Sequence, residues 1–135
     1  MNNQTLLPAG WPRPKGCANG VSASGRMVFV AGMVGWDAQG VFQSGDMADQ
    51  VQQALDNVVA VLAEAGARPE HITRMTWYVT DKREYVARQS EVGQAYRDVI
   101  ADIEPINYQW LGAFDGNLRD VGEMEAYLVG AGLEP

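Results

Sequence analysis

The sequence contains a single cysteine, a single histidine and no long apolar run. One cysteine, Cys17, excludes an internal disulfide and a multi-cysteine metal site. A membrane-spanning helix needs about 18 or more apolar residues in succession, and no stretch of the chain provides them. The first residues lack the positively charged and apolar regions of a signal peptide. We therefore expect a cytoplasmic protein with no membrane partner and no metal centre.

Basic residues are also few. Lysine and arginine together number 10 against 17 aspartates and glutamates, which gives a formal net charge of −7, and the basic residues form no run. A nucleic-acid-binding protein needs a concentrated basic face that displaces counterions from phosphates. Nucleic acid is therefore not an expected partner, and a ribonuclease is disfavoured. The glycines fit neither a phosphate-binding loop nor a dinucleotide fingerprint, so neither nucleotide-binding motif is present.

The chain is long enough for one hydrophobic core. It has 135 residues, of which 47% are hydrophobic, and this size is typical of a single domain. Pro8, Pro12 and Pro14 disfavour a helix near the N-terminus. The sequence therefore predicts an extended arm over residues 1–16, followed by a single domain over residues 17–135.

Two short apolar runs follow the arm. Residues 18–23 and 27–31 flank Ser24 and Gly25, and turn residues between two such runs predict a β-hairpin. Residues 27–30 are apolar at every position, which is typical of a strand that is covered on both faces.

The apolar period then changes to three and four residues. This spacing predicts an amphipathic helix over residues 46–65. Ser44 is the expected N-cap, with Asp46 as an acid in the first turn. Gly66 is expected to end the helix, since glycine readily adopts the left-handed conformation found there.

The second half of the chain predicts a strand over 72–80, a helix capped by Asp81 and running to about Ile100, and strands over 108–114 and 123–129. The order is β-β-α-β-α-β-β. Two helices in this order can cover one face of a mixed sheet, which gives an α+β fold.

Aromatic residues on the predicted strands cannot all face the helices. These residues are Trp77, Tyr108, Trp110 and Tyr127. An exposed apolar sheet face usually marks an interface, and packing several copies around an axis would bury it. The pattern therefore indicates self-association.

Four segments resemble one family, and they occur in the same order as in that family. They are residues 28–32, 50–66, 76–81 and 121–126. Together they resemble the RidA/YjgF family. The resemblance implies a chorismate-mutase-like homotrimer with its sheets facing inward and a ligand cleft between subunits. It also implies hydrolysis of reactive enamines and imines to ketoacids and ammonia, without a cofactor.

The resemblance assigns two principal site positions. Glu123 matches a glutamate in the family's closing motif that positions water. Asn107 stands where the family's Pro-Ala-Arg-Ser motif has an arginine that clamps the substrate carboxylate. An amide can hydrogen-bond a carboxylate but cannot form the charged bidentate pair that arginine forms. This chain therefore resembles a divergent member that lacks the clamping arginine.

Other substrate-binding candidates lie near the start of the domain. Cys17 stands at the position of a family tyrosine, and the segment Ala31, Gly32 and Met33 replaces Ser-Gly-Gln. Arg13 and Lys15, on the arm, could restore the positive charge that Asn107 lacks. The alternative interpretations are structural: Glu123 is a surface strand residue, Cys17 a small wall residue, and the arm cations are solvated.

Two functions remain open from the sequence. The first is cofactor-independent hydrolytic deamination of an enamine or imine, including aminomuconate-type compounds, by a water that Glu123 positions. The second is a non-catalytic trimer that binds a small metabolite or a partner protein in the cleft between subunits. Where the ligand is a small molecule, we expect it to carry a carboxylate.

Overall fold

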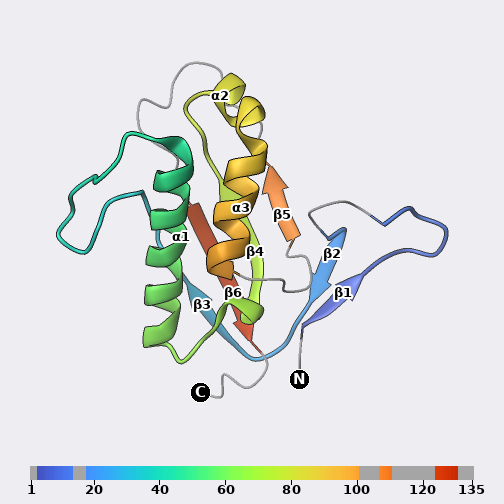
Figure 1. The fold of residues 1–135 in the computed structure, drawn as a ribbon. Helices are drawn as coiled ribbons and strands as arrows, with labels where there is room; N and C mark the ends of the chain where they lie inside the picture. The colour runs from blue at the N-terminus through green and yellow to red at the C-terminus, as the bar shows by residue number, and fades with distance from the viewer. Residues whose placement is uncertain (1–2, 14–17, 101–106, 111–123, 131–135) are drawn as a thin grey trace.

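A mixed four-stranded sheet forms the centre of the molecule (Figure 1). The computed structural model describes residues 3–13, 18–100, 107–110 and 124–130. The strand order is β3 (Arg26–Phe29), β6 (Met124–Gly130), β4 (Ile72–Trp77) and β5 (Asn107–Trp110). Strand β6 is antiparallel to both of its neighbours, whereas β4 and β5 are parallel. Strands β3 and β5 are thus the two edges of the sheet.

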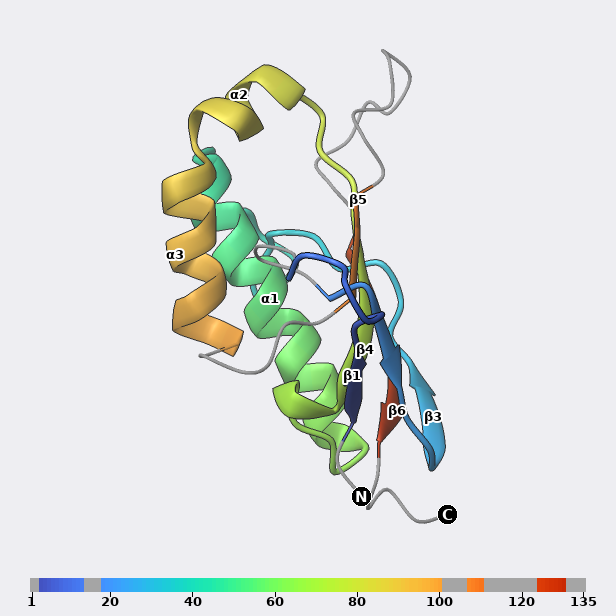
Figure 2. The ribbon, with the colours of Figure 1, turned by 90° about the vertical axis from the view of Figure 1, so that its right-hand side faces the viewer.

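The helices form one layer on one face of this sheet (Figure 2). The layer consists of α1 (Met47–Glu64), α2 (Lys82–Ala87) and α3 (Gln89–Ile100), and α1 packs against α3. The apolar stripe of α1 and the inner side of β4 form the core between the layers, with Leu55, Leu62 and Met75 fully buried. The predicted α+β fold is confirmed.

The N-terminal region forms a separate two-stranded ribbon. Strand β1 (Gln4–Leu6) pairs antiparallel with β2 (Gly20–Ser22). The predicted hairpin between residues 18–23 and 27–31 is therefore wrong, because β2 pairs with β1 and β3 pairs with β6. Turn residues indicate a change of direction, but they do not determine which strand becomes the partner. The predicted boundary between arm and domain lies within residues 14–17, outside the described residues.

The N-terminus of α1 differs in its cap from the prediction. Asp46 is the N-cap, and its side chain accepts a hydrogen bond from the backbone N–H of Asp49. Ser44 lies two residues earlier: its hydroxyl oxygen accepts from the backbone N–H of Asp46, and the hydroxyl donates to the Asp49 carboxylate. The predicted end of the helix is confirmed, since Gly66 has a φ of +70°.

The predicted second helix is two helices. Asp81 caps α2 as predicted, accepting from the backbone N–H groups of Arg83 and Glu84. The helix then breaks at Arg88, which has φ −116° and ψ 21°. The Arg88 side chain forms ion pairs with Asp46 and with Glu91. The break thus places the joint between α2 and α3 against the N-cap of α1.

Candidate functional site

The sheet face opposite the helices, which we call the open face, is apolar along β3. Met27 and Phe29 lie on it with 59% and 66% of their surface exposed, while Val28 packs against the core. The prediction that this strand is covered on both faces is therefore wrong for a single protomer. Trp77, by contrast, faces the helices, with its ring 6.3 Å from that of Tyr96. Burial of the open face requires another molecule.

One row of residues crosses the whole sheet on this face. The register pairs Phe29 with Tyr127, Tyr127 with Arg74, and Arg74 with Asn107. Cross-strand partners of this kind share a sheet face. Asn107, the first residue of β5, therefore occupies the register position beside Arg74. Arg74 is exposed.

The candidate residues of a single protomer lie at opposite edges of the sheet. Ala31, Gly32 and Met33 follow β3 at one edge, whereas Asn107 lies in β5 at the other. Neighbouring strands are about 4.8 Å apart, so roughly 14 Å separates these two edges. Ala31 and Gly32 are exposed, while Met33 is half-buried and packs against the core. One small ligand cannot contact both groups within a protomer.

The other candidates are placed less completely. Glu123, Cys17 and Lys15 lie outside the described residues; Glu123 directly precedes β6, whose first residue pairs with Trp77. Arg13 is exposed and belongs to the segment between β1 and β2, which projects on the β5 side of the protomer (Figure 1).

The loop after β3 is fixed to α1 by residues that the sequence did not single out. The Asn57 side chain donates hydrogen bonds to the backbone carbonyls of Val34 and Trp36. Between them, Gly35 approaches the helix so closely that a Cβ would lie 2.7 Å from the Cβ of Gln50. These contacts fix residues 34–36 and thereby position the candidate segment Ala31 to Met33, which directly precedes them.

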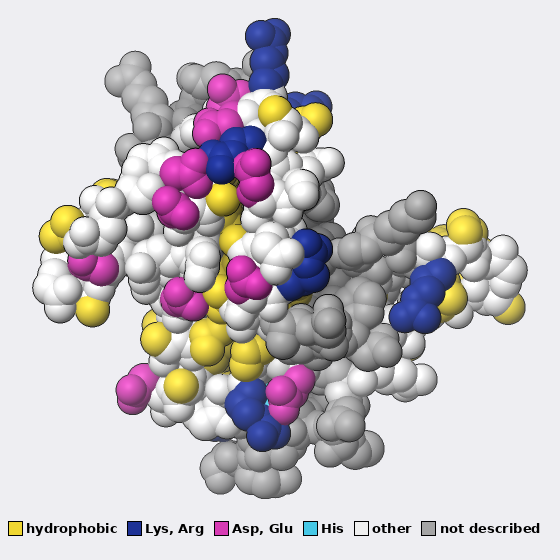
Figure 3. Space-filling model, viewed as in Figure 1, with side chains coloured by type: hydrophobic (Ala, Val, Ile, Leu, Met, Phe, Trp, Pro, Cys, Tyr) yellow, Lys and Arg dark blue, Asp and Glu magenta, His cyan; other side chains and the backbone are white. Residues whose placement is uncertain are grey.

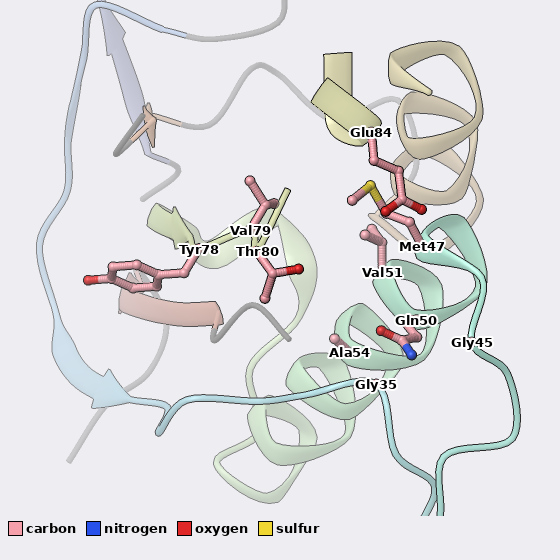
Figure 4. A pocket seen from close by; sticks show the side chains of 10 residues that line it. All are labelled: Gly35, Gly45, Met47, Gln50, Val51, Ala54, Tyr78, Val79, Thr80 and Glu84. Atoms are coloured by element: carbon pink, nitrogen blue, oxygen red, sulfur yellow. The ribbon is translucent and has the colours of Figure 1, made fainter. Parts of the chain in front are cut away.

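A cavity of about 170 Å³ lies between this loop, α1, the end of β4 and the start of α2 (Figure 4). Apolar side chains line much of it, and the polar groups include Gln50, Thr80 and Glu84. Among the residues with a described position, no lysine, arginine or histidine lines it, and Glu84 adds a negative charge. The cavity is therefore poorly suited to a carboxylate, and of the predicted site residues that the structure describes none lines it.

Charged side chains of both signs are interspersed over the helix layer (Figure 3). One arginine there pairs with two acids: Arg88 lies between Asp46 and Glu91. Its hydrogen bond is the main reason that the pKa of Asp46 is lowered from the usual 3.8. This cluster stabilises the junction of three helices and contains no uncompensated positive charge for a ligand.

Within the described ranges, no group of three or more histidine, cysteine, aspartate or glutamate side chains is arranged to hold a metal ion. No helix in the described part of the chain is long and apolar enough to cross a membrane.

Comparison with known proteins identifies the family. The model of the endoribonuclease L-PSP family matches residues 14–110. A RutC family protein from Pyrococcus abyssi is 28% identical, over 81% of this chain and 99% of the relative. Another from Synechocystis is 29% identical, over 75% of this chain and 79% of the relative.

Solved structures agree with these sequence relatives. The crystal structure of a Rid-family protein of unknown function from Yersinia pestis superposes with a TM-score of 0.80 at 29% identity, covering 96% of this chain and 99% of that one. A YjgF-family protein from Mycobacterium tuberculosis superposes with a TM-score of 0.56 at 28% identity, covering 85% and 87% of the two chains. Since the family model spans well over half of the sequence, the chain belongs to the RidA/YjgF family, whose model is described as endoribonuclease L-PSP.

Proposed function

We propose that the chain forms a homotrimer and hydrolyses a carboxylate-bearing enamine or imine in a cleft between subunits, without a cofactor. The observation that carries the assembly is the separation of the candidate residues. The segment after β3 and the start of β5 lie at opposite edges of the sheet. In a cyclic assembly, different edges of neighbouring protomers come together, so residues too far apart in one protomer can meet in the same cleft.

The open face supports the same arrangement. Met27 and Phe29 expose most of their surface there, although Val28 between them packs on the core. Apolar side chains clustered on an uncovered sheet face mark an interaction surface. Packing three open faces around an axis would remove them from water and would leave the helices on the outside.

The proposed chemistry is addition of water to the C=N carbon. An enamine first becomes an imine by taking up a proton at carbon and losing one from nitrogen. Glu123 then removes a proton from water while the oxygen bonds to the imine carbon and the nitrogen takes up a proton. The resulting carbinolamine expels ammonia, and a ketoacid remains. A carboxylate whose pKa is raised by partial burial is suited to such transfers. Aminomuconate-type compounds are within this substrate class.

The test is release of ketoacid from imines generated in place by an amino-acid oxidase. We expect Glu123→Gln to lower the rate by about 10²–10⁴-fold, because the amide keeps the size of the side chain but cannot accept the proton. Glu70→Gln is the matched control, since the Glu70 side chain is exposed and pairs with the exposed side chain of Arg68. A rate for Glu123→Gln within about twofold of wild type would contradict the mechanism.

A second function keeps the cleft but not the chemistry: a non-catalytic trimer that binds a small metabolite or a partner. Asn107 at the arginine position favours it, because a neutral amide orients a carboxylate less strongly than a guanidinium does. Wild-type protein that binds ketoacids but releases none from any imine tested would support this second function.

A further inference from the structure

Arg74 has a distinctive position among the basic residues of the sheet. Of the cations on the described strands, Arg26 belongs to the helix side, where its guanidinium donates to the backbone carbonyl of Ala65 at the end of α1. Arg74 instead directly precedes Met75, which is fully buried in the core. Successive strand residues face opposite sides of a sheet, so Arg74 lies on the open face.

An irregularity in β4 is what places Arg74 there. Residues two apart in a regular strand share a face, yet Ile72 is buried in the core and Arg74 is exposed. The register between β4 and β6 shifts between these two residues, as in a β-bulge. Bulges redirect side chains and are frequent next to active sites. Without the shift, the arginine would point into the helix layer.

The register then brings this cation to the position where the family's arginine is absent. Arg74 is paired with Asn107 across the parallel β4–β5 ladder. Directly opposed residues have their Cβ atoms about 5 Å apart, and a long side chain can span such a distance. A guanidinium on β4 can therefore reach the space that an arginine on β5 would serve.

Burial of the open face would remove the Arg74 guanidinium from water, so its charge and its N–H groups would need partners. A guanidinium removed from water needs an anionic partner, because an unpaired buried charge is strongly destabilising. Arg74 already takes part in an interaction within the protomer. A guanidinium has five N–H donors, so one partner does not exhaust it. Glu125, which pairs with Thr76 two positions along the same ladder, is an acidic residue near Arg74 by register.

The geometry points to Arg74 as the carboxylate-binding cation of the intersubunit cleft, taking over from β4 the role that Asn107 cannot perform. The ligand class is a small α-keto or α-imino carboxylate. This inference rests on the proposed cleft, but it does not require that the protein be catalytic. It also makes the arm cations Arg13 and Lys15 unnecessary for charge recognition.

The test measures binding rather than turnover. Pyruvate, a ketoacid of the product class, and methyl pyruvate, its neutral ester, are titrated into wild-type trimer and followed by NMR chemical shifts. We expect wild type to prefer pyruvate by at least about tenfold, since charge-assisted bidentate hydrogen bonds are about twice as strong as neutral ones. Arg74→Gln should weaken pyruvate binding by a similar factor and leave the ester unchanged. Arg68→Gln, an exposed arginine paired with Glu70, is the control and should change neither.

A second test moves the guanidinium from position 74 on β4 to position 107 on β5, so that the inference does not depend on a single variant. The double variant Arg74→Gln/Asn107→Arg should recover at least half of the lost preference for pyruvate, because the guanidinium returns to the neighbouring strand. Equal binding of pyruvate and its ester by wild type would overturn the inference. So would undiminished pyruvate binding by Arg74→Gln. If wild type hydrolyses no imine but its pyruvate binding depends on Arg74, the proposed activity fails while this inference stands.

Discussion

Replacing Gly35 by alanine should destabilise the protein substantially, because this residue sets how closely the loop after β3 approaches α1. An added Cβ would lie 2.7 Å from the Cβ of Gln50 and 2.8 Å from its Cα and its carbonyl oxygen. Two of these three atoms are backbone atoms inside a helix, so they cannot move aside without distorting α1. The loop would have to retreat instead.

The retreat would be opposed by Asn57, whose side chain holds the carbonyls of Val34 and Trp36 on either side of Gly35. Each of these neutral hydrogen bonds contributes about 1 kcal/mol, and overpacking at such a contact costs about 1–3 kcal/mol. Either the loop retreats and loses the hydrogen bonds, or it stays and is overpacked. The less costly of these two responses sets the loss of stability. We therefore expect Gly35→Ala to lower the free energy of unfolding by about 2 kcal/mol.

The assay is urea denaturation at a fixed protomer concentration, since the proposed assembly would make the apparent stability concentration-dependent. Gly45→Ala is the control from the same loop: a Cβ there meets no heavy atom within 4 Å, so the change should stay within about 0.5 kcal/mol. Equal urea midpoints for the two variants would refute the argument that close approach requires glycine at position 35.

Two further perturbations address the interface and the helix junction. Phe29→Glu should convert the proposed trimer to monomers, because the trimer would bury an unpaired carboxylate on the open face, whereas changing the exposed Val86 of α2 to Glu should leave the mass in solution unchanged. Arg88→Met should raise the pKa of Asp46 toward 3.8, which carboxyl NMR titration measures directly. Since the folded-state pKa is the lowered one, the stabilisation is present above about pH 3.8 and is lost as the pH falls through that lower value. Identical titration of Asp46 in both proteins would contradict its pairing with Arg88.

The regular parts of the fold were predictable because they follow from local periodicity. The apolar stripe of α1 continues without interruption, so the predicted range 46–65 differs by one residue at each end from Met47–Glu64. The break at Arg88 gave no such signal. Tyr85 and Val92, which are both buried, are seven residues apart, and this spacing also fits the buried side of one continuous helix. The choice of cap between Ser44 and Asp46 failed for a related reason, because both residue types are good N-caps.

The site was less predictable, since its arrangement depends on partners distant in sequence. The shift that turns Arg74 to the open face exists only relative to β6, and the pairing of Arg74 with Asn107 depends on the β4–β5 register. Neither the shift nor the pairing can be recognised from the pattern of apolar residues in β4 alone. The close contact of Gly35 with Gln50 likewise requires knowing where the loop crosses the helix. The sequence could name Asn107 as a departure from the family motif, but not the residue beside it.

The mass of the protein in solution tests the central claim, that the site is completed only between protomers. Sedimentation equilibrium or light scattering across a range of concentrations should give about 44 kDa, three times the protomer mass of 14.7 kDa. A mass of 14.7 kDa at all concentrations would leave Ala31 to Met33 and Asn107 on opposite edges of one sheet, and it would contradict both the trimer and the intersubunit cleft.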